Sequence, residues 1–142
     1  MSMTLNERVP QNVIIPVGSQ SSTITLPAQY VRKRSRIKNV WAIDQAGVAA
    51  DNTNYLTLSL QDSSSNVYAT YDSRAAAQGA LTANVASALK LASPDLTLED
   101  PNAPASQQEQ DVPAGTQLQL VVTLHGSAVL TKALLEVEIY PA

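Results

Sequence analysis

Two glutamates near the end of the chain come closest to a pair of catalytic carboxylates. Glu136 and Glu138 are spaced i, i+2 in a segment that alternates apolar and polar residues. On a strand this spacing places both side chains on one face, with Cα atoms about 6.5–7 Å apart, and carboxyl groups at such separations serve glycosidases. The alternation also places both on the polar face, whereas a catalytic pair needs surroundings that make the pKa values of its two carboxyls different. We therefore interpret them as water-facing acids.

The other polar residues form no familiar catalytic or metal-binding pattern. His125 is the only histidine and cysteine is absent, whereas metal sites need several ligands at defined spacing. No Gly-x-Ser-x-Gly motif marks a nucleophile, and the five glycines are too scattered to form a phosphate-binding loop. The sequence alone does not exclude a Ser–His–Asp triad, because the three residues of a triad come together only in the folded chain. The sequence predicts a protein that is not an enzyme and has no cofactor and no metal.

Composition and charge narrow the choice of partners. The 142 residues carry a net charge of −3, whereas a nucleic-acid-binding domain is normally basic. The longest apolar stretches fall far short of the ~20 residues that span a bilayer. Hydrophobic residues make up 44% of the chain, enough for a core without disulfides at this length. We expect no nucleic-acid partner and no membrane partner.

Apolar and polar residues alternate with a period of two from residue 22 onward, which is typical of strands with one buried face. Shorter candidate strands cover residues 66–71, 86–91 and 95–99. Seven or eight short strands separated by turns predict an all-β fold, an antiparallel β-sandwich over residues 22–142. The apolar sets expected to face the core are Ile24 and Leu26; Ile37, Trp41 and Ile43; Leu56, Leu58 and Leu60; Leu118, Leu120, Val122 and Leu124; and Leu135, Val137 and Ile139.

Two segments break this pattern. Residues 73–91 are rich in alanine, which favours a helix, but Gly79 interrupts them and no stripe of large apolar residues appears. We expect a loop or short helical turn, followed by a strand. Residues 100–115 contain three prolines and a polar run, which argue against a strand and predict a long loop.

Residues 1–21 are expected to form an extended N-terminal arm. Pro10 and Pro16 interrupt the segment, because proline removes a backbone donor that a central strand needs. Its aliphatic residues are nevertheless too many for a terminal segment that makes no contacts. Two alternatives are open: an edge strand on the chain's own domain, or an arm that adds a strand to a neighbouring subunit.

Basic residues concentrate in residues 32–38, which hold five of the nine lysines and arginines. One interpretation is a solvated strand face whose charges prevent edge-to-edge aggregation. The other is a basic patch that meets an acidic surface, such as the acidic loop of a neighbouring copy.

Four segments together resemble the head decoration (cement) proteins of tailed bacteriophages. They are R-I-K-N-V-W at 36–41, D-N-T-N-Y-L-T-L at 51–58, V-P-A-G-T-Q-L-Q-L at 112–120 and the closing strand at 134–140. The resemblance spans residues 30–142 and implies a small jelly-roll-like sandwich without enzymatic activity. Such proteins are often trimeric clamps on the outside of the capsid lattice, and their N-terminal arms commonly reach along the shell.

The expected function is therefore that of a structural virion protein that binds the major capsid protein as a homotrimer and stabilises the shell. It would be made in the bacterial host cytoplasm and located on the capsid surface. The alternative is a carbohydrate- or receptor-binding module of a phage fibre, which would need Trp41 in an exposed aromatic platform. The candidate capsid or subunit contacts are Leu5, Arg8, Val9, Val13, Ile14, Ile15, Arg32, Lys33 and Arg34.

Overall fold

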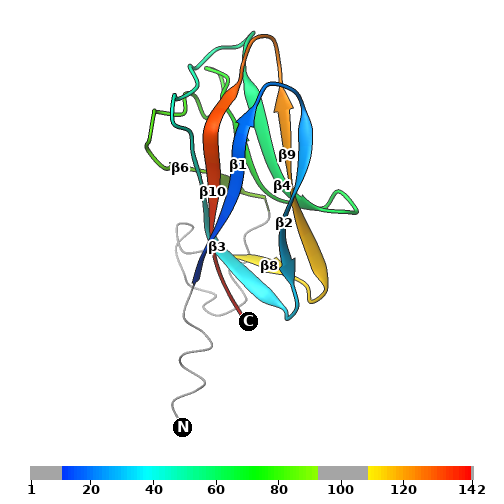
Figure 1. Cartoon of the computed structure of the whole chain (residues 1–142). Coiled ribbons are helices and arrows are strands. Elements are labelled where there is room, and N and C mark those ends of the chain that lie inside the picture. Colours follow the sequence, from blue (N-terminus) through cyan, green and yellow to red (C-terminus); the bar gives the residue numbers. More distant parts are fainter. Residues whose placement is uncertain (1–10, 93–108, 142) are drawn as a thin grey trace.

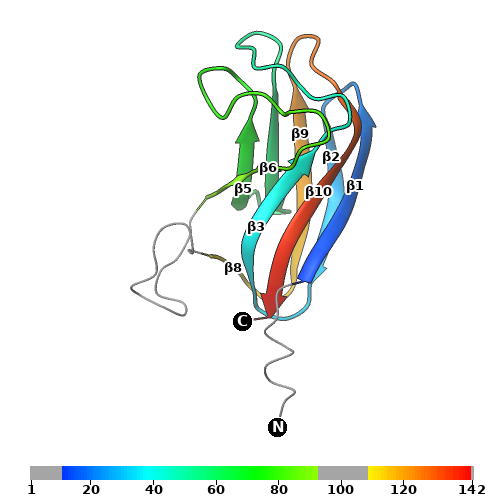
Figure 2. The same cartoon turned by 90° about the vertical axis from the view of Figure 1, so that its left-hand side faces the viewer.

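The chain folds as two antiparallel sheets packed face to face, in a computed structural model that describes residues 11–92 and 109–141 (Figures 1 and 2). None of the described residues is helical. Sheet A has the order β1-β10-β3-β6, with β8 also paired to β3, and sheet B has the order β2-β9-β4-β5-β7. The strands are β1 (Gln11–Gln20), β2 (Ile24–Val31), β3 (Ser35–Ile43), β4 (Leu56–Asp62), β5 (Val67–Asp72), β6 (Ser87–Ala88), β7 (Lys90–Leu91), β8 (Gln110–Val112), β9 (Thr116–Leu124) and β10 (Leu130–Pro141).

The core lies between the sheets and is formed by the alternating residues that the sequence singled out. Leu120 of β9 is fully buried, and Leu135 and Val137 of β10 are 1% exposed, so the central strands of both sheets face one interior. The β-sandwich prediction is confirmed. A one-residue shift in the pairing register of any of these strands would expose its apolar residues to water. The predicted residues with 3% exposure or less are Ile37, Leu56, Leu58, Leu60, Leu118, Leu120, Val122, Leu135 and Val137.

Strand β3 departs from the predicted alternation. Ile139 of β10 pairs with Ile37, but the next residue back along β10, Glu138, pairs with Asn39, so β3 holds one extra residue. This β-bulge reverses which face the following residues occupy. Val40 and Ala42 are buried in place of their neighbours. The expectation that Trp41 packs in the core is therefore wrong: it lies half-buried on the outer face of sheet A.

The N-terminal segment is an edge strand of the chain's own sheet. Residues 11–20 form β1, which pairs with β10 from Gln11 to Gln20 and buries Ile15 and Val17 in the core. The prediction of an arm reaching to residue 21 is thus corrected for these residues, because alternate apolar side chains here add to the sandwich core. Pro16 is tolerated because β1 lies at the edge of the sheet.

A second correction concerns residues 110–112, which were expected to belong to a long loop. They form β8, which pairs with residues 35–37 of β3 and buries Val112. The prolines flank this short strand rather than interrupt it. The strand predicted at 95–99 lies outside the described residues. Residues 73–86 do form turns, as expected, and the strands β6 and β7 follow.

The sandwich has two distinct ends, the groove end and the loop end. At the groove end, a turn of residues 32–34 joins β2 to β3, and β10 finishes beside it (Figure 1). At the loop end, longer segments join β3 to β4 and β5 to β6, next to the β9–β10 turn. Among the described residues, no helix is long and apolar enough to cross a membrane.

Candidate functional site

An open groove of about 540 Å³ lies at the groove end of the sandwich. It is formed by the start of β1, the end of β10, the end of β2 and the β2–β3 turn. Because β1 and β2 are edge strands of different sheets, no strand pairing closes the space between them. The residues that define its character are Val13, Tyr30, Arg32, Lys33, Ile139 and Pro141.

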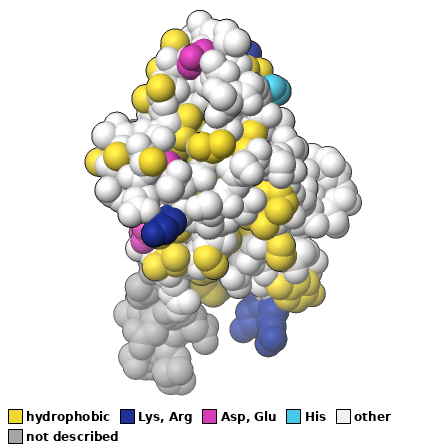
Figure 3. Space-filling view, turned by 45° about the horizontal axis from the view of Figure 1, so that its top comes forward, with side chains coloured by type: hydrophobic (Ala, Val, Ile, Leu, Met, Phe, Trp, Pro, Cys, Tyr) yellow, Lys and Arg dark blue, Asp and Glu magenta, His cyan; other side chains and the backbone are white. Residues whose placement is uncertain are grey.

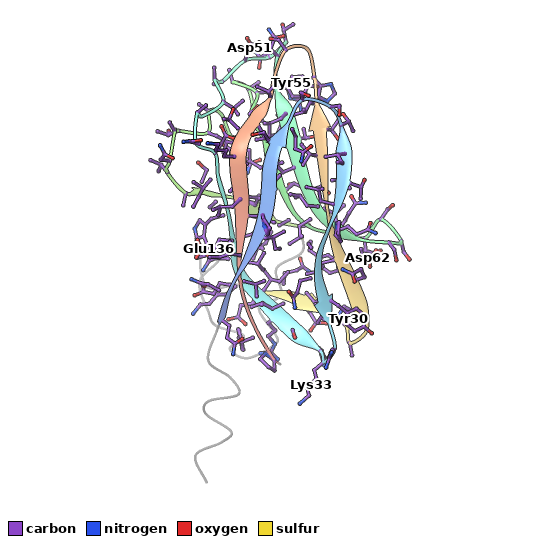
Figure 4. All side chains as sticks on the ribbon, in the orientation of Figure 1. Tyr30, Lys33, Asp51, Tyr55, Asp62 and Glu136 are labelled. Carbon is purple, nitrogen blue, oxygen red and sulfur yellow. The ribbon has the colours of Figure 1, made fainter. Side chains whose placement is uncertain are left out.

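The rim of the groove is basic. Arg32 and Lys33 are exposed, and the structure records no ion pair for either of them within the described part of the chain. Figure 4 shows Lys33 projecting from the lower end of the molecule, with Tyr30 just above it, and Figure 3 shows basic side chains protruding from the same end. Tyr30 is 52% exposed. The groove therefore combines an exposed aromatic ring with two cations.

The neighbouring arginines are engaged within the chain. Arg34 donates from Nε to Oδ1 of Asp111 in β8 at 2.8 Å. The basic segment thus does meet an acidic one, but inside the same chain. Arg36 was expected on a solvated face together with Arg34 and Lys38, yet it is only 8% exposed.

The predicted contact residues from the N-terminal segment separate into three environments. Val13 lines the groove, Ile15 is buried in the core at 3% exposure, and Ile14 is 62% exposed on the outer face of sheet A. Successive residues of a strand point to opposite faces, so one contact surface cannot contain all three. Leu5, Arg8 and Val9 lie outside the described residues.

The outer face of sheet A carries a row of residues across three strands. Ile14 of β1 is opposite Glu136 of β10, which is opposite Trp41 of β3. The Nδ2 group of Asn12 donates to Oε1 of Glu136 at 3.0 Å, and an equivalent bond of 2.7 Å joins Asn39 to Glu138. Both glutamates are half-buried on this face, and each accepts a hydrogen bond from an asparagine amide group.

Three side chains stack at the loop end. The ring of His125 lies 4.2 Å from that of Tyr55, nearly parallel at 13°, and the guanidinium carbon of Arg74 lies 4.9 Å from the Tyr55 ring centre. Arg74 also donates from Nε to Oδ2 of Asp72 at 2.9 Å. Tyr55 begins the approach to β4, Arg74 follows β5 and His125 follows β9, so the stack connects three chain segments. Figure 4 places Tyr55 and Asp51 at this end.

Hydrogen bonds hold the surrounding loops. Oδ1 of Asn54 accepts from the backbone of Ser127 at 2.9 Å, and Oδ1 of Asp51 accepts from the backbone of Thr53 and Asn54 at 2.7 and 3.0 Å. The backbone N–H groups of Asn54 and Thr53 lower the pKa of Asp51. The hydrogen bond from Arg74 lowers the pKa of Asp72.

Asp44 lies in the interior of the loop end, directly after β3. It is fully buried, and its Oδ1 accepts from the backbone N–H of Thr131 at 2.6 Å. Its Oδ2 has no hydrogen-bond partner, and the adjoining cavity is lined mainly by aliphatic residues such as Val17 and Leu81. This carboxylate fastens the end of β3 to the start of β10. It does not face the groove.

No cluster of three or more potential metal ligands occurs within residues 11–92 and 109–141. Comparison of the chain with protein families, curated proteins and solved structures finds no match. Any functional assignment therefore has to be argued from the chain's own surfaces.

Sequence reasoning missed part of the groove. Tyr30, Ile139 and Pro141 line it, although none was singled out as a contact. Tyr30 lies two residues before Arg32, and a tyrosine this close to a short basic segment is a local signal from which it could have been predicted. No local signal indicates that Ile139, more than 100 residues away, lies at the same groove. Tyr30 belongs to β2 of sheet B and Ile139 to β10 of sheet A, so the packing of the two sheets brings them together.

Proposed function

We propose that this chain is a structural virion protein that binds the major capsid protein on the outside of the assembled shell and stabilises it, without catalysing a reaction. In this proposal it acts as a homotrimer on the capsid surface of a tailed bacteriophage. The proposal starts from the resemblance of residues 30–142 to head decoration proteins and rests on one structural observation, the order of the strands.

That observation is the way consecutive strands cross between the two sheets. β1, β3, β6 and β10 lie in one sheet, and β2, β4, β5 and β9 lie in the other. From the orders β1-β10-β3-β6 and β2-β9-β4-β5 we infer a jelly-roll-like sandwich of eight strands, with β7 and β8 as short additions. Double-sheet jelly rolls occur in viral capsid proteins and in lectins, so the order supports both the proposed function and its main alternative.

The groove gives the proposed function a means of attachment. A decoration protein stabilises a shell by binding the assembled state more tightly than its free subunits, since binding to one state of an equilibrium favours that state. The groove places apolar and basic residues at one end of a rigid sandwich, where a protein partner can reach them. Ile14, a predicted contact that is exposed on the outer face of sheet A, would serve contacts between copies.

Co-sedimentation tests the proposal. Purified protein is mixed with shells assembled from the major capsid protein of the same genome and, separately, with the unassembled subunits. We expect saturable binding to the shells, little binding to the subunits and a higher melting temperature of the decorated shells. Light scattering of the free protein measures the oligomer. Absence of binding to assembled shells would contradict the proposal.

A carbohydrate-binding module of a phage fibre is the second candidate, and the position of Trp41 favours it. The indole lies on the outer face of sheet A opposite Glu136, where aromatic and polar groups together could accept a sugar ring. Trp41 is the only tryptophan, so its fluorescence reports this face alone. A saturable fluorescence change on addition of a glycan would favour the module, and an unchanged signal across a glycan panel would favour the decoration protein.

A further inference from the structure

We propose that the groove binds an extended, acidic segment of the protein partner, with an aliphatic side chain on the groove floor and carboxylates at its basic rim. The identity of the partner as a capsid protein rests on the proposed function. The chemistry of the segment rests on the groove alone.

The floor of the groove is apolar and continuous with the core. Val13 of β1 and Ile139 of β10 are partly buried and pack against the buried cluster, and both also line the groove. They lie on the same face of sheet A, because Val13 pairs with Val137, two residues from Ile139. An aliphatic side chain placed on them would extend the core and would remove apolar surface from water. Tyr30, 52% exposed, forms a wall beside this floor.

The rim selects for negative charge. Among the described residues, those that line the groove include Arg32 and Lys33 but no aspartate or glutamate, although the whole chain carries a net charge of −3. Two acidic residues of this end are already engaged: Asp111 is paired with Arg34, and Glu109 accepts a hydrogen bond from the hydroxyl of Tyr140. Arg32 and Lys33 have no ion pair within the described residues and remain open to carboxylates from outside, so charge complementarity favours an acidic partner.

The strands beside the groove favour an extended partner. β1 and β2 are the edge strands of their sheets, so each presents backbone donors and acceptors on its outer side. An extended segment lying along such an edge can form main-chain hydrogen bonds while its alternate side chains enter a pocket. At about 540 Å³ the groove is within the usual range of ligand pockets, about 300–1,000 Å³.

Fluorescence anisotropy with short labelled peptides tests the chemistry directly. The probe alternates Glu and Leu; one comparison peptide replaces Leu with Ser, and the other replaces Glu with Lys. We expect the Glu–Leu peptide to bind best, the Ser peptide to bind more weakly and the Lys peptide not to bind. Raising the salt concentration should weaken binding of the Glu–Leu peptide, because its carboxylates meet exposed cations. Equal binding of all three peptides would overturn the proposal.

Charge reversal locates the site. The double variant Arg32→Glu/Lys33→Glu should weaken binding of the Glu–Leu peptide by about tenfold or more. The matched control is Lys90→Glu/Lys132→Glu, which changes the net charge equally at exposed positions in β7 and β10 that do not line the groove. The control should stay within about twofold of the unaltered protein. Equal losses in both double variants would mean that only overall charge matters, and would overturn the proposal.

The same variants separate this inference from the proposed function. Circular dichroism and thermal unfolding first establish that both double variants are folded. If the groove variant loses both the peptide and the shells, both conclusions stand. Shell binding that survives the groove variant overturns the inference and leaves the proposed function intact. If the unaltered protein binds the peptide but does not bind assembled shells, the inference about the groove is supported and the proposed function is contradicted.

Discussion

At the loop end, Tyr55 stacks against His125 and Arg74, and Asn54 accepts a hydrogen bond from the backbone of Ser127. At the groove end, Arg32 and Lys33 are exposed and form no ion pair within the described part of the chain, and Tyr30 is 52% exposed. Both ends are built from connections between the same two sheets. They differ in whether their polar and aromatic groups are used inside the chain.

This difference separates groups that stabilise the fold from groups that remain for a partner. A hydrogen bond or stack already made within the chain has to be broken before its members can bind anything else, and breaking it leaves groups unsatisfied. Asp72, for example, would have to leave Arg74. Arg32 and Lys33 have no ion pair within the described residues that would have to be broken before they bind a partner. Substitutions at matched positions of the two ends therefore test the difference.

Glycine replacement should give the largest contrast. Gly47, at the loop end, has φ +77°, and an added Cβ would lie 2.8 Å from the backbone oxygen of Leu81 and 2.9 Å from the backbone nitrogen of Ala83. Gly115, near the groove end, has φ +82°, but the closest atom to its Cβ is the Tyr30 hydroxyl at 4.0 Å. We expect Gly47→Ala to lower the free energy of unfolding by about 2–5 kcal/mol, through both strain and overpacking. Gly115→Ala should cost about 1–2 kcal/mol, from backbone strain alone.

Urea unfolding of the two variants measures both values. A cost for Gly115→Ala equal to or above that of Gly47→Ala would show that the loop end is not the more tightly packed one.

Tyrosine truncation gives a smaller contrast of the same kind. Tyr55→Ala removes the ring between His125 and Arg74 and should lower the free energy of unfolding by about 1–2 kcal/mol, since aromatic pairs and cation–π contacts each contribute roughly 0.5–1.5 kcal/mol. Tyr30→Ala should change it by less than about 0.5 kcal/mol, as is usual for exposed positions, but should weaken binding of the Glu–Leu peptide. Thermal unfolding and fluorescence anisotropy together test the pair. The comparison fails if Tyr30→Ala destabilises the protein more than Tyr55→Ala.

Part of the pH dependence of stability should trace to the loop end, in addition to the part from Asp62 in the β4–β5 turn, whose pKa is lowered by the side chain of Asn66. Hydrogen bonds from Arg74 and from backbone N–H groups lower the pKa values of Asp72 and Asp51 below their ordinary value of 3.8. Because the folded pKa lies below the unfolded one, this stabilisation is complete at neutral pH and is lost as the pH falls through the folded pKa. We expect unfolding to become easier below about pH 4, by a small amount because both carboxyl groups are partly open to solvent. Asp51→Asn/Asp72→Asn should flatten the profile in this range, and an unchanged profile would contradict the assignment.

How far the sequence predicts this molecule depends on whether a feature is local. The sets around Leu58, Leu120 and Val137 are regular, and their period of two predicts buried faces correctly. Trp41 was misplaced because the bulge in β3 arises from pairing with β10, about 100 residues away, and leaves no mark in the local alternation. The three prolines between residues 100 and 115 predict a loop, so β8 was not expected. The strand forms because its partner strand supplies the hydrogen bonds and because Val112 packs in the core.

The candidate site shows the same limit. The turn of residues 32–34 was recognisable from its charge alone, and Val13 from the apolar N-terminal segment. That both line one groove follows from the position of β1 and β2 as edges of different sheets. The stack of Tyr55 on His125 joins residues 70 positions apart in the chain, and nothing near either one predicts the other.

The ion pair between Arg34 and Asp111, beside the groove, should have a small effect on stability. Arg34 and Asp111 have side-chain exposures of 59% and 31%, and exposed pairs of this kind contribute about 0.2–1 kcal/mol. Asp111→Asn should therefore change the free energy of unfolding by less than about 1 kcal/mol. It also releases Arg34 next to Arg32 and Lys33, so the Glu–Leu peptide should bind about twofold to fivefold more tightly. Asp72→Asn, which breaks the corresponding pair with Arg74 at the loop end and changes net charge equally, should leave peptide affinity unaltered. Tighter binding in both variants would trace the effect to net charge, and weaker binding in Asp111→Asn would show that the pair shapes the groove rather than competing with its partner.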